Sequence, residues 1–302
     1  MSRKSMVTVC IVIFEMCVIG TTIQAEQKGT PVFGRIDTTT FQHYKNVHDG
    51  AGGQYFQEML GSKIFESNQY FIHYCIIEPR SGIGEHLHRN SEEMYFAFDR
   101  PAEFTVNGHT ALLPAGSCVL CPLSSSHGIY NNSDEPLEFL NIAVLSEMDK
   151  GVVNYGEDLT NQKIESPAPF KWANFDRTLL KPITECHQGK GELFFRRMWS
   201  SDSFKTNALF LDHLILPPDT SIGYHQHNNM EEVYYILGGK GRITVNNHTW
   251  DVIKGDTVPC TSHDSHGIYN NTDEELEIFV WAVSLEKGLG TAKDLGDDLA
   301  DK

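Results

Sequence analysis

The feature of this sequence that most restricts its possible folds is a long internal repeat. The run HLHRNSEE at residues 86–93 returns as HQHNNMEE at residues 225–232, a displacement of 139 residues. Further matched runs have the same displacement, so no insertion or deletion separates them. The repeated unit extends from about Val47 to Glu147 and from about Cys186 to Glu286. Because solenoid units are much shorter than this, the repeat indicates two whole domains.

The repeated runs contain residue types that bind transition metals. Two histidines one residue apart share one face of a β-strand, since strand side chains alternate with period two. A third histidine opens a second repeated run, HGIYN, at His127 and again at His266. Three neutral imidazoles and a carboxylate form a site for a divalent transition metal, with positions left for water or substrate. The repeat therefore predicts two metal sites, one in each domain.

Length and composition agree with two globular domains. The 302 residues suffice for two domains that each bury a core, and 40% hydrophobic with 21% charged residues are typical of a globular chain. The formal net charge of -16 argues against nucleic acid as a partner, because an acidic surface repels a phosphate backbone. We therefore expect no nucleic-acid partner, and the charge says nothing further about the substrate.

The pattern of apolar residues predicts a chain built from short strands. Residues 70–77 (YFIHYCII) and 209–216 (LFLDHLIL) are β-rich apolar runs, each followed by a proline within two residues. The glycine-rich stretch 238–241 predicts a hairpin turn into a strand at 242–245. Helix signals are few, so we expect an all-β fold of antiparallel barrels or jelly rolls. The run SPAP at 166–169 indicates a linker between the copies.

Together these residues resemble the two motifs of the cupin superfamily, and the repeat makes the chain similar to a bicupin. The first motif is HxH, three or four residues, Glu, six residues, Gly; the second copy matches it through Gly239, whereas the first copy has Arg100 there. Both copies keep the His and Asn that end the second motif. The resemblance implies two tandem double-stranded β-helix (cupin, jelly-roll-like) barrels. It gives a first cupin domain at 26–165, a linker at 166–186 and a second cupin domain at 187–302.

The resemblance also implies one divalent transition metal in each barrel, which would be manganese, iron or copper, with zinc as an alternative. The implied ligands are His86, His88, Glu93 and His127 in the first barrel and His225, His227, Glu232 and His266 in the second. The motif spacing also allows Glu92 and Glu231, and strand alternation points only one carboxylate of each adjacent pair inward. We favour Glu93 and Glu232, which stand seven residues before the turn position.

The reaction is less constrained than the fold. Related oxalate oxidases and decarboxylases hold oxalate with a polar residue three positions before the HxH motif, where this chain has Ile83 and Ile222. Isoleucine cannot clamp a carboxylate as arginine does, so oxalate becomes one option among several. The leading hypothesis is a metal-dependent oxidoreductase of dioxygenase or oxidase type acting on a small organic substrate. Two alternatives stay open: a non-catalytic metal- or ligand-binding glycoprotein with a storage or matrix role, and a metal-dependent isomerase or lyase.

The N-terminus is predicted to be a cleaved signal peptide at residues 1–25. Arg3 and Lys4 precede an apolar stretch that ends near Ala25, and no second apolar run of membrane-spanning length follows. We therefore expect a secreted protein without a membrane anchor, and the resemblance allows a homodimer. Secretion makes three Asn-x-Ser/Thr sequons candidate glycosylation sites, at Asn131, Asn247 and Asn270.

Two further groups of residues lie outside the cupin motifs. Cys118 and Cys121, two of the five cysteines that would remain after cleavage, have a CxxC spacing. Positions i and i+3 on a strand face opposite sides, so buried or disulfide-linked cysteines are the favoured interpretation. His48 and His187 recur in HxGxG runs 139 residues apart. They either start a strand or close over a site, and a structural role is the favoured interpretation.

Overall fold

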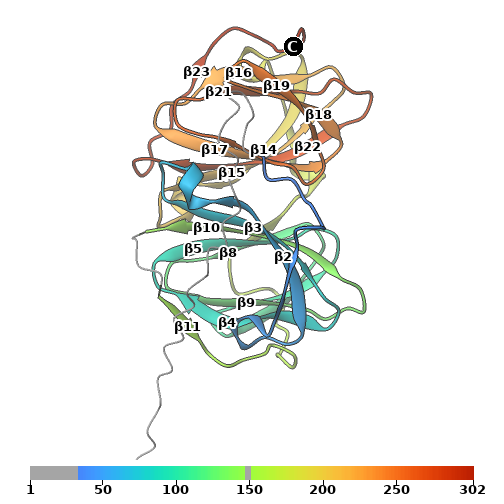
Figure 1. The fold of residues 1–302 in the computed structure, drawn as a ribbon, viewed down its shortest axis with the longest axis vertical. Helices are drawn as coiled ribbons and strands as arrows, with labels where there is room; N and C mark the ends of the chain where they lie inside the picture. The colour runs from blue at the N-terminus through green and yellow to red at the C-terminus, as the bar shows by residue number, and fades with distance from the viewer. Residues whose placement is uncertain (1–32, 147–150) are drawn as a thin grey trace, which may run out of the picture. The chain divides into compact units, whose positions relative to one another are not determined.

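The computed structural model describes residues 33–146 and 151–302 (Figure 1). The predicted signal peptide lies outside these residues. Within them the strands are joined by loops and by one-turn 3₁₀ helices, so the chain is all β, as predicted. No helix in this part of the chain is both long and apolar enough to span a bilayer. The 3₁₀ helices are η1 (Val47–Asp49), η2 (Ser62–Ile64), η3 (Arg177–Leu179), η4 (Cys186–Gln188) and η5 (Ser201–Ser203).

The first barrel consists of two antiparallel sheets around an apolar core that includes Ile77, Phe104 and Phe139. The larger sheet has the strand order β1 (Gln42–Lys45), β2 (Gly53–Gly61), β3 (Gln69–Ile77), β10 (Leu137–Leu145), β5 (Ser91–Ala97), β8 (Ser117–Cys121) and β12 (Trp172–Asn174). The smaller sheet has the order β11 (Val152–Asn154), β4 (Ser81–His88), β9 (Ser126–Asn131), β6 (Ala102–Val106) and β7 (His109–Leu113).

The second barrel repeats this plan around a core that includes Leu216, Ile243 and Ile278. Its larger sheet has the order β13 (Lys181–Thr184), β14 (Glu192–Ser200), β15 (Ala208–Leu216), β22 (Leu276–Ser284), β17 (Met230–Gly238) and β20 (Thr257–Cys260). Its smaller sheet has the order β19 (His248–Ile253), β18 (Lys240–Val245), β21 (Ser265–Tyr269), β16 (Ser221–Gln226) and β23 (Lys293–Asp294). The matching strand orders confirm the duplication and the tandem barrels.

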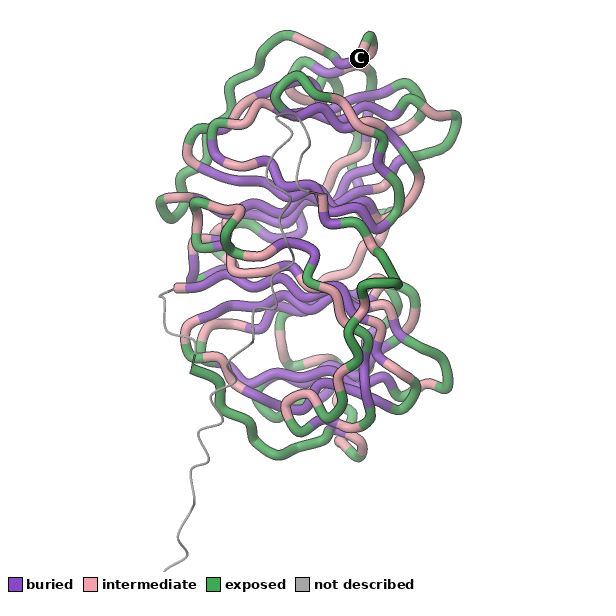
Figure 2. The backbone as a smooth tube through the Cα atoms, in the orientation of Figure 1, coloured by how far each residue is buried: buried purple, intermediate pink, exposed green. Residues whose placement is uncertain are grey.

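The larger sheets of the two barrels also share an apolar core formed by side chains that point away from each barrel's interior. Strand alternation sends Phe96 and Cys118 of the first barrel into the same cluster as Tyr235 and Phe279 of the second. The rings of Phe96 and Phe279 stack with their centroids 5.2 Å apart. The central strands β10 and β22 are therefore covered on both faces and are buried almost throughout (Figure 2). This explains why their sequences are continuously apolar rather than alternating.

All five cysteines in the described residues are free, and four of them are buried. Cys118 packs in the core between the barrels and Cys121 in the core of the first barrel, on opposite faces of β8 as predicted. Burial raises the pKa of Cys118 to about 12, so this thiol stays protonated. The structure thus supports the interpretation as buried thiols and not the one as disulfides.

The hairpin predicted at Gly238–Gly241 is wrong. β17 ends at Gly238 and β18 begins at Lys240, but the two strands belong to different sheets. Gly239 has φ 78°, and a Cβ there would lie 2.2 Å from the carbonyl oxygen of Glu275. The glycine therefore lets the chain cross from one sheet to the other. The hairpin of this region joins β18 to β19 through Asn246 and Asn247, which both have positive φ.

The segment 166–186, expected to be a linker, contributes strands to both barrels. Its strand β12 pairs with β8 at the edge of the first barrel, and β13 pairs with β14 in the second. At the start of the described chain, Gly34 pairs with Thr257 of the second barrel. The Arg35 guanidinium beside it donates to both carboxylate oxygens of Asp256 at 2.6 and 2.7 Å. Backbone pairing as well as the shared core therefore connects the two barrels.

Candidate metal centres

In each barrel the predicted ligands come from both sheets and meet between them. His86 and His88 lie on β4, and His127 lies on the neighbouring strand β9, where its Cα is paired with that of His86. Glu93 lies on β5 of the opposite sheet. A register shift between Ile83 and His86 interrupts the pairing just before the HxH motif. The second barrel has the same shift at the equivalent position.

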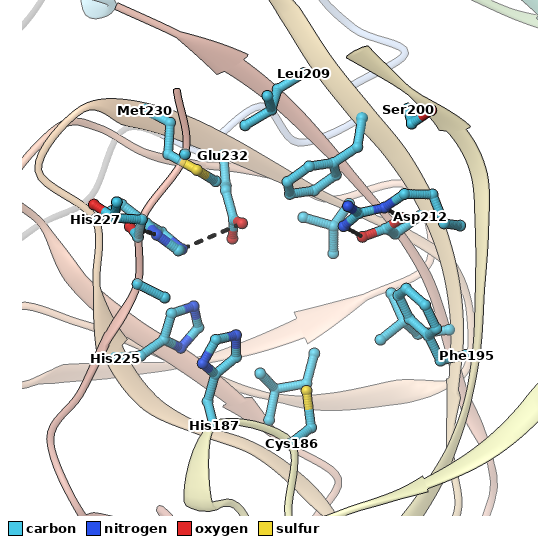
Figure 3. Close-up of a pocket in the computed structure, with 18 of the residues that line it drawn as sticks. Cys186, His187, Phe195, Ser200, Leu209, Asp212, His225, His227, Met230 and Glu232 are labelled. Atoms are coloured by element: carbon cyan, nitrogen blue, oxygen red, sulfur yellow. Dashed lines mark hydrogen bonds and ion pairs between the residues drawn. The ribbon is translucent and has the colours of Figure 1, made fainter. Parts of the chain in front are cut away.

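In the second barrel the four predicted ligands form one compact group (Figure 3). One donor atom each from His225, His227, Glu232 and His266 lies within 4.8 Å of the others, and all four residues are buried. The carboxylate of Glu232 is central to the group. Its Oε2 lies 3.0 Å from Nε2 of His266, and its Oε1 lies 3.3 Å from Nε2 of His227.

The first barrel gathers its four predicted ligands less tightly: donor atoms of His88, Glu93 and His127 lie within 4.8 Å of one another, whereas His86 falls in a second group with His88. Oε1 of Glu93 lies 3.1 Å from Nε2 of His88, and Oε2 lies 3.5 Å from Nε2 of His127. The ring of His86 packs against that of His127, with centroids 4.6 Å apart. A fifth residue, His48, brings a ring nitrogen within 4.8 Å of donor atoms of His86 and His88.

Backbone carbonyls determine which ring nitrogen faces each centre. Nδ1 of His86 and Nδ1 of His225 each lie close to the carbonyl oxygen of the glycine two residues earlier, at 2.9 and 2.8 Å. Nδ1 of His227 lies 2.7 Å from the carbonyl oxygen of Thr291. Because a carbonyl only accepts, these Nδ1 atoms carry the proton. A neutral ring held in this way directs the lone pair of Nε2 toward the centre.

This arrangement fits a bound cation. The Glu93 and Glu232 carboxylates face imidazole nitrogens at 3.0 to 3.5 Å. Where Nδ1 carries the ring proton, as in His227, the lone pair of Nε2 faces the carboxylate, and a positive charge between them would relieve the repulsion. Nε2 of His266 instead lies within hydrogen-bond distance of Glu232, at 3.0 Å. Oε1 of Glu93, Nε2 of His127 and Nε2 of His227 are buried and have no hydrogen-bond partner within the described residues. Three imidazoles and one carboxylate suit a divalent transition metal with open coordination positions. A metal would satisfy all of these atoms at once.

The environment favours the protonation states that metal binding requires. Burial lowers the pKa of His88 to about 4 and, together with a neighbouring imidazole, that of His225 to about 2. Burial alone would raise the pKa of Glu93, but the imidazoles beside it and an amide outweigh burial and lower it to about 2. His227 differs, because Glu232 outweighs burial and raises its pKa. At neutral pH the centres therefore combine ionised carboxylates with neutral imidazoles at His86, His88 and His225, as metal coordination demands.

The adjacent carboxylates, Glu92 and Glu231, point away from the centres. Glu92 accepts hydrogen bonds of 2.6 to 2.9 Å from the backbone N–H groups of residues 205–206 in the second barrel. Glu231 accepts 2.9 Å bonds from the N–H groups of residues 66–67 in the first barrel. The structure thus places Glu93 and Glu232 at the centres, and Glu92 and Glu231 at the junction of the barrels.

His48 and His187, for which a structural role was favoured, lie against the centres. Each ring stacks on the first histidine of its HxH motif, with centroids 3.7 and 3.8 Å apart. Both residues have left-handed φ values, 50° and 52°. Nδ1 of His48 lies 2.9 Å from Oδ1 of Asn154, and Nδ1 of His187 lies 2.7 Å from Oδ1 of Asp294. The recurrence of HxGxG at the repeat spacing was the sequence signal for this position.

A cavity of about 460 Å³ opens onto the second centre. Its wall is largely apolar and includes Ile222, at the position predicted to lack a carboxylate clamp. Besides the residues of the centre, its polar lining includes two serines, a threonine and an ion pair between Arg197 and Asp212. Figure 3 places Asp212 across the cavity from Glu232. Burial raises the pKa of Asp212 to about 6 although Arg197 opposes this shift.

Two of the three predicted glycosylation sites are not available in the folded protein. Asn131 and Asn270 are fully buried, and glycosylation would have to modify their side-chain nitrogen. That nitrogen donates to three backbone carbonyls in Asn131 and to two in Asn270, at 2.7 to 3.2 Å. Asn247 is exposed at the tip of the β18–β19 hairpin and keeps its place as a candidate.

The family of the chain follows from two comparisons. The cupin-domain family model matches residues 73–143 and again residues 212–282. An oxalate-binding protein of Thermotoga maritima is 31% identical over 103 residues, which are 34% of this chain and 85% of that protein. The chain is a tandem cupin. An uncharacterized protein of Methanocaldococcus jannaschii is 37% identical to this cupin over 83 residues, covering 28% of this chain and 66% of that protein.

Solved bicupin structures share the whole arrangement. Oxalate decarboxylase from Bacillus subtilis superposes with a TM-score of 0.61 at 16% identity, covering 89% of this cupin and 80% of that chain. Salicylate 1,2-dioxygenase from Pseudaminobacter salicylatoxidans superposes with a TM-score of 0.57 at 17% identity, covering 79% and 78%. At these identities the likeness establishes the fold, and the reaction has to be argued from the site.

Proposed function

We propose that this tandem cupin is a metal-dependent oxidoreductase of dioxygenase or oxidase type that acts on a small organic substrate. In this proposal each barrel holds one divalent transition metal through its three histidines and one glutamate. The observation that carries the proposal is the convergence of buried imidazole nitrogens on the carboxylates of Glu93 and Glu232. The Mn(II) centres of Bacillus subtilis oxalate decarboxylase and the oxygenase activity named for salicylate 1,2-dioxygenase support it.

The roles of the residues follow from their contacts. A bound metal would offer coordination positions for dioxygen or for an oxygen atom of the substrate. The carbonyl groups behind His86, His225 and His227 hold the ring proton on Nδ1 and aim Nε2 at the centre. In the second barrel, apolar residues such as Ile222 and Leu214 line the cavity and limit the access of water to the centre. Strand-borne ligands with fixed second contacts make a preorganised site.

Metal content tests the proposal first. We expect about two manganese, iron or copper ions per chain, measured by mass spectrometry on protein that was never exposed to a nickel column. The loaded protein should then consume oxygen with a suitable organic substrate, which an oxygen electrode would record. Zinc at both centres would favour the isomerase or lyase alternative, which needs no oxygen. A folded protein without metal would contradict the proposal.

A second candidate function is non-catalytic binding of a small molecule. It is favoured by the name of the Thermotoga maritima relative, which describes binding and not turnover. A binding protein would hold metal and ligand with no oxygen consumption and no change in the ligand after long incubation. Mass spectrometry of the recovered ligand therefore separates the two candidates.

Secretion is a further part of the proposal. It is supported by the basic and then apolar character of residues 1–25. Expression of the full sequence in a eukaryotic host should release a chain that begins near residue 26 into the medium. Mass measurement of the released protein would also report any glycan at Asn247. Retention of the full-length chain inside the cell would contradict this part of the proposal.

A further inference from the structure

Equivalent positions of the two barrels carry different charge pairs. In the second barrel Arg197 on β14 and Asp212 on β15 are paired across adjacent strands. The positions 139 residues earlier are Glu58 on β2 and His73 on β3, which are paired in the same register. The strand pairing at these positions is thus the same in both barrels, and only the charged side chains differ. Any ligand that recognises these groups would distinguish the two barrels.

The Arg197 guanidinium is held in a fixed position. Its Nε and Nη2 donate to the two carboxylate oxygens of Asp212 at 2.8 and 2.7 Å. Its central carbon lies 4.2 Å from the centroid of the Phe210 ring, a cation–π contact. Asp212 is 5% exposed, whereas 47% of the Arg197 side chain is exposed. The Arg197 guanidinium lines the cavity of the second centre, and its Nη1 takes no part in the two hydrogen bonds to Asp212. A guanidinium fixed in this way is preorganised to receive a carboxylate.

The first barrel has no such donor at this place. Oε2 of Glu58 lies 3.8 Å from Nε2 of His73, and the His73 ring stacks on Phe71 with centroids 3.8 Å apart. Burial lowers the pKa of His73, so its imidazole is neutral at neutral pH. The pair then consists of a carboxylate and a neutral ring. A second carboxylate brought to this pair would be repelled rather than bound.

We propose that the second barrel alone binds an organic carboxylate, with Arg197 receiving the carboxylate group and Phe195, Phe210 and Leu214 contacting its apolar body. This inference rests on the proposed function and deepens it, because it names the substrate class of the second centre. The cavity of about 460 Å³ lies in the range of small-molecule sites. Its apolar wall suits a molecule of about one aromatic ring. The end of the substrate opposite the carboxylate would then face the metal ligands, because Asp212 and Glu232 lie on opposite sides of the cavity (Figure 3).

Titration calorimetry of the full-length, metal-loaded protein with benzoate tests the inference, with benzamide as a neutral probe of the same shape. We expect one benzoate per chain although the chain has two centres, because Arg197 has no counterpart in the first barrel. Benzamide should bind about 10-fold more weakly or worse, since it lacks the charge-assisted hydrogen bonds. Two benzoates per chain, equal affinity for benzamide, or no saturable binding would overturn the inference.

Variants in the two barrels provide matched controls. The double variant R197M/D212N removes the pair without leaving a buried carboxylate unpaired, and it should weaken benzoate binding about 10-fold or more. The double variant E58Q/H73N changes the equivalent positions of the first barrel and should leave benzoate binding unchanged. R197K keeps the charge and loses the planar fork, so it should also weaken binding and serves if R197M/D212N does not fold. Unchanged binding in the Arg197 variants, or an equal loss in the first-barrel variant, would overturn the inference.

The binding measurement also separates this inference from the proposed function. It needs neither oxygen nor turnover. Arg197-dependent binding of benzoate by a protein that consumes no oxygen with any organic acid would contradict the oxidoreductase proposal and leave the carboxylate site standing. Oxygen consumption by a protein without Arg197-dependent binding would contradict the carboxylate site alone.

Discussion

A histidine buried among other histidines is easier to keep neutral than charged, and both centres use this fact. Burial lowers the pKa of His86, and the charges of His127 and His48 would lower it further. The carbonyl oxygen of Gly84 fixes the tautomer, so the lone pair of Nε2 is ready for a metal. The centre is therefore prepared before the metal arrives, and the free energy needed to hold the imidazoles neutral is part of the folding free energy.

The metal-free protein should consequently lose stability in mild acid. Histidine has an ordinary pKa of 6.5, whereas in the folded chain His88 has a pKa of about 4 and His225 of about 2. Between the ordinary pKa of 6.5 and these lowered values, the unfolded state binds more protons than the folded state. The free energy of unfolding is therefore highest above pH 6.5 and decreases as the pH is lowered. The loss is at most about 1.4 kcal/mol per pH unit for each such histidine.

The thermal unfolding midpoint of chelator-treated protein between pH 8 and pH 5 measures this effect. Asp212 and His227 act in the opposite sense, because their raised pKa values mean that protonation favours the fold. They are outnumbered by the histidines whose pKa is lowered, which are His48, His73, His86, His88 and His225. We expect the thermal unfolding midpoint to decrease as the pH is lowered below 6.5. A midpoint that stayed constant or rose toward pH 5 would show that these imidazoles are not held neutral.

At the scale of single elements, each centre depends on a close approach between a 3₁₀ turn and the ligand strand. A Cβ on Gly84 would lie 2.2 Å from the carbonyl oxygen of His48, and a Cβ on Gly223 would lie 2.1 Å from that of His187. Only glycine on the ligand strand allows η1 and η4 to come this near. The stacking of His48 and His187 on the HxH motifs follows from that approach.

Gly84→Ala and Gly223→Ala should therefore push these turns away from the ligand strands. We expect each to destabilise the fold by about 1 to 3 kcal/mol, because the clash is with backbone and not with a flexible side chain. Gly238→Ala is the matched control, since a Cβ there would meet nothing within 4 Å. Denaturant unfolding at neutral pH compares the three variants. Equal stability of Gly84→Ala and Gly238→Ala would mean that the η1 turn moves away without a measurable loss in the free energy of unfolding.

The sequence predicted the fold and the grouping of the ligands because both depend on local periodicity and on spacing. The HxH runs fix two side chains on one strand face, and the repeat fixes the second copy. The turn at Gly239 was misjudged, since a glycine marks a change of direction without telling which sheet receives the next strand. The roles of Glu92 and Glu231 could not be predicted either. Their partners lie more than a hundred residues away, on the other barrel.

At the scale of the whole molecule, the two barrels hold each other by reciprocal contacts. Glu92 binds the backbone of residues 205–206, and Glu231 binds that of residues 66–67, so each contact is the 139-residue image of the other. Both carboxylates are buried. Each stands next to a predicted metal ligand on the same strand, Glu93 on β5 and Glu232 on β17. The strands that present the metal ligands therefore also fasten the barrels together.

Glu92→Gln and Glu231→Gln should loosen this connection. An amide accepts fewer and weaker bonds than a carboxylate, so we expect a loss of about 1 to 3 kcal/mol for each variant. Glu192→Gln changes an exposed residue of β14 and should leave the free energy of unfolding unchanged. Urea unfolding measures all three, and an earlier, separate transition of one barrel would be the clearest sign of loosening. Stabilities equal to that of Glu192→Gln would show that the shared core alone joins the barrels.

The barrels should nevertheless fill with metal independently, because no residue is shared between the two predicted ligand sets. Replacing His86 and His88 by alanine removes two imidazoles from the first centre and leaves the second centre intact. We expect the metal content to fall from about two ions per chain to about one. His225 and His227 replaced by alanine should give the mirror result.

His109→Ala is the control for these variants, since this histidine is exposed and outside both centres, and it should keep both ions. Each emptied centre should lower the thermal midpoint, because the metal binds only the folded form. If either double variant lost both ions, the structural change at the emptied centre would have to reach the other centre through the contacts between the barrels. The junction formed by Glu92, Glu231 and the shared apolar core is the structural route for such coupling, so combining Glu231→Gln with the His86 and His88 replacements would then restore metal to the second centre.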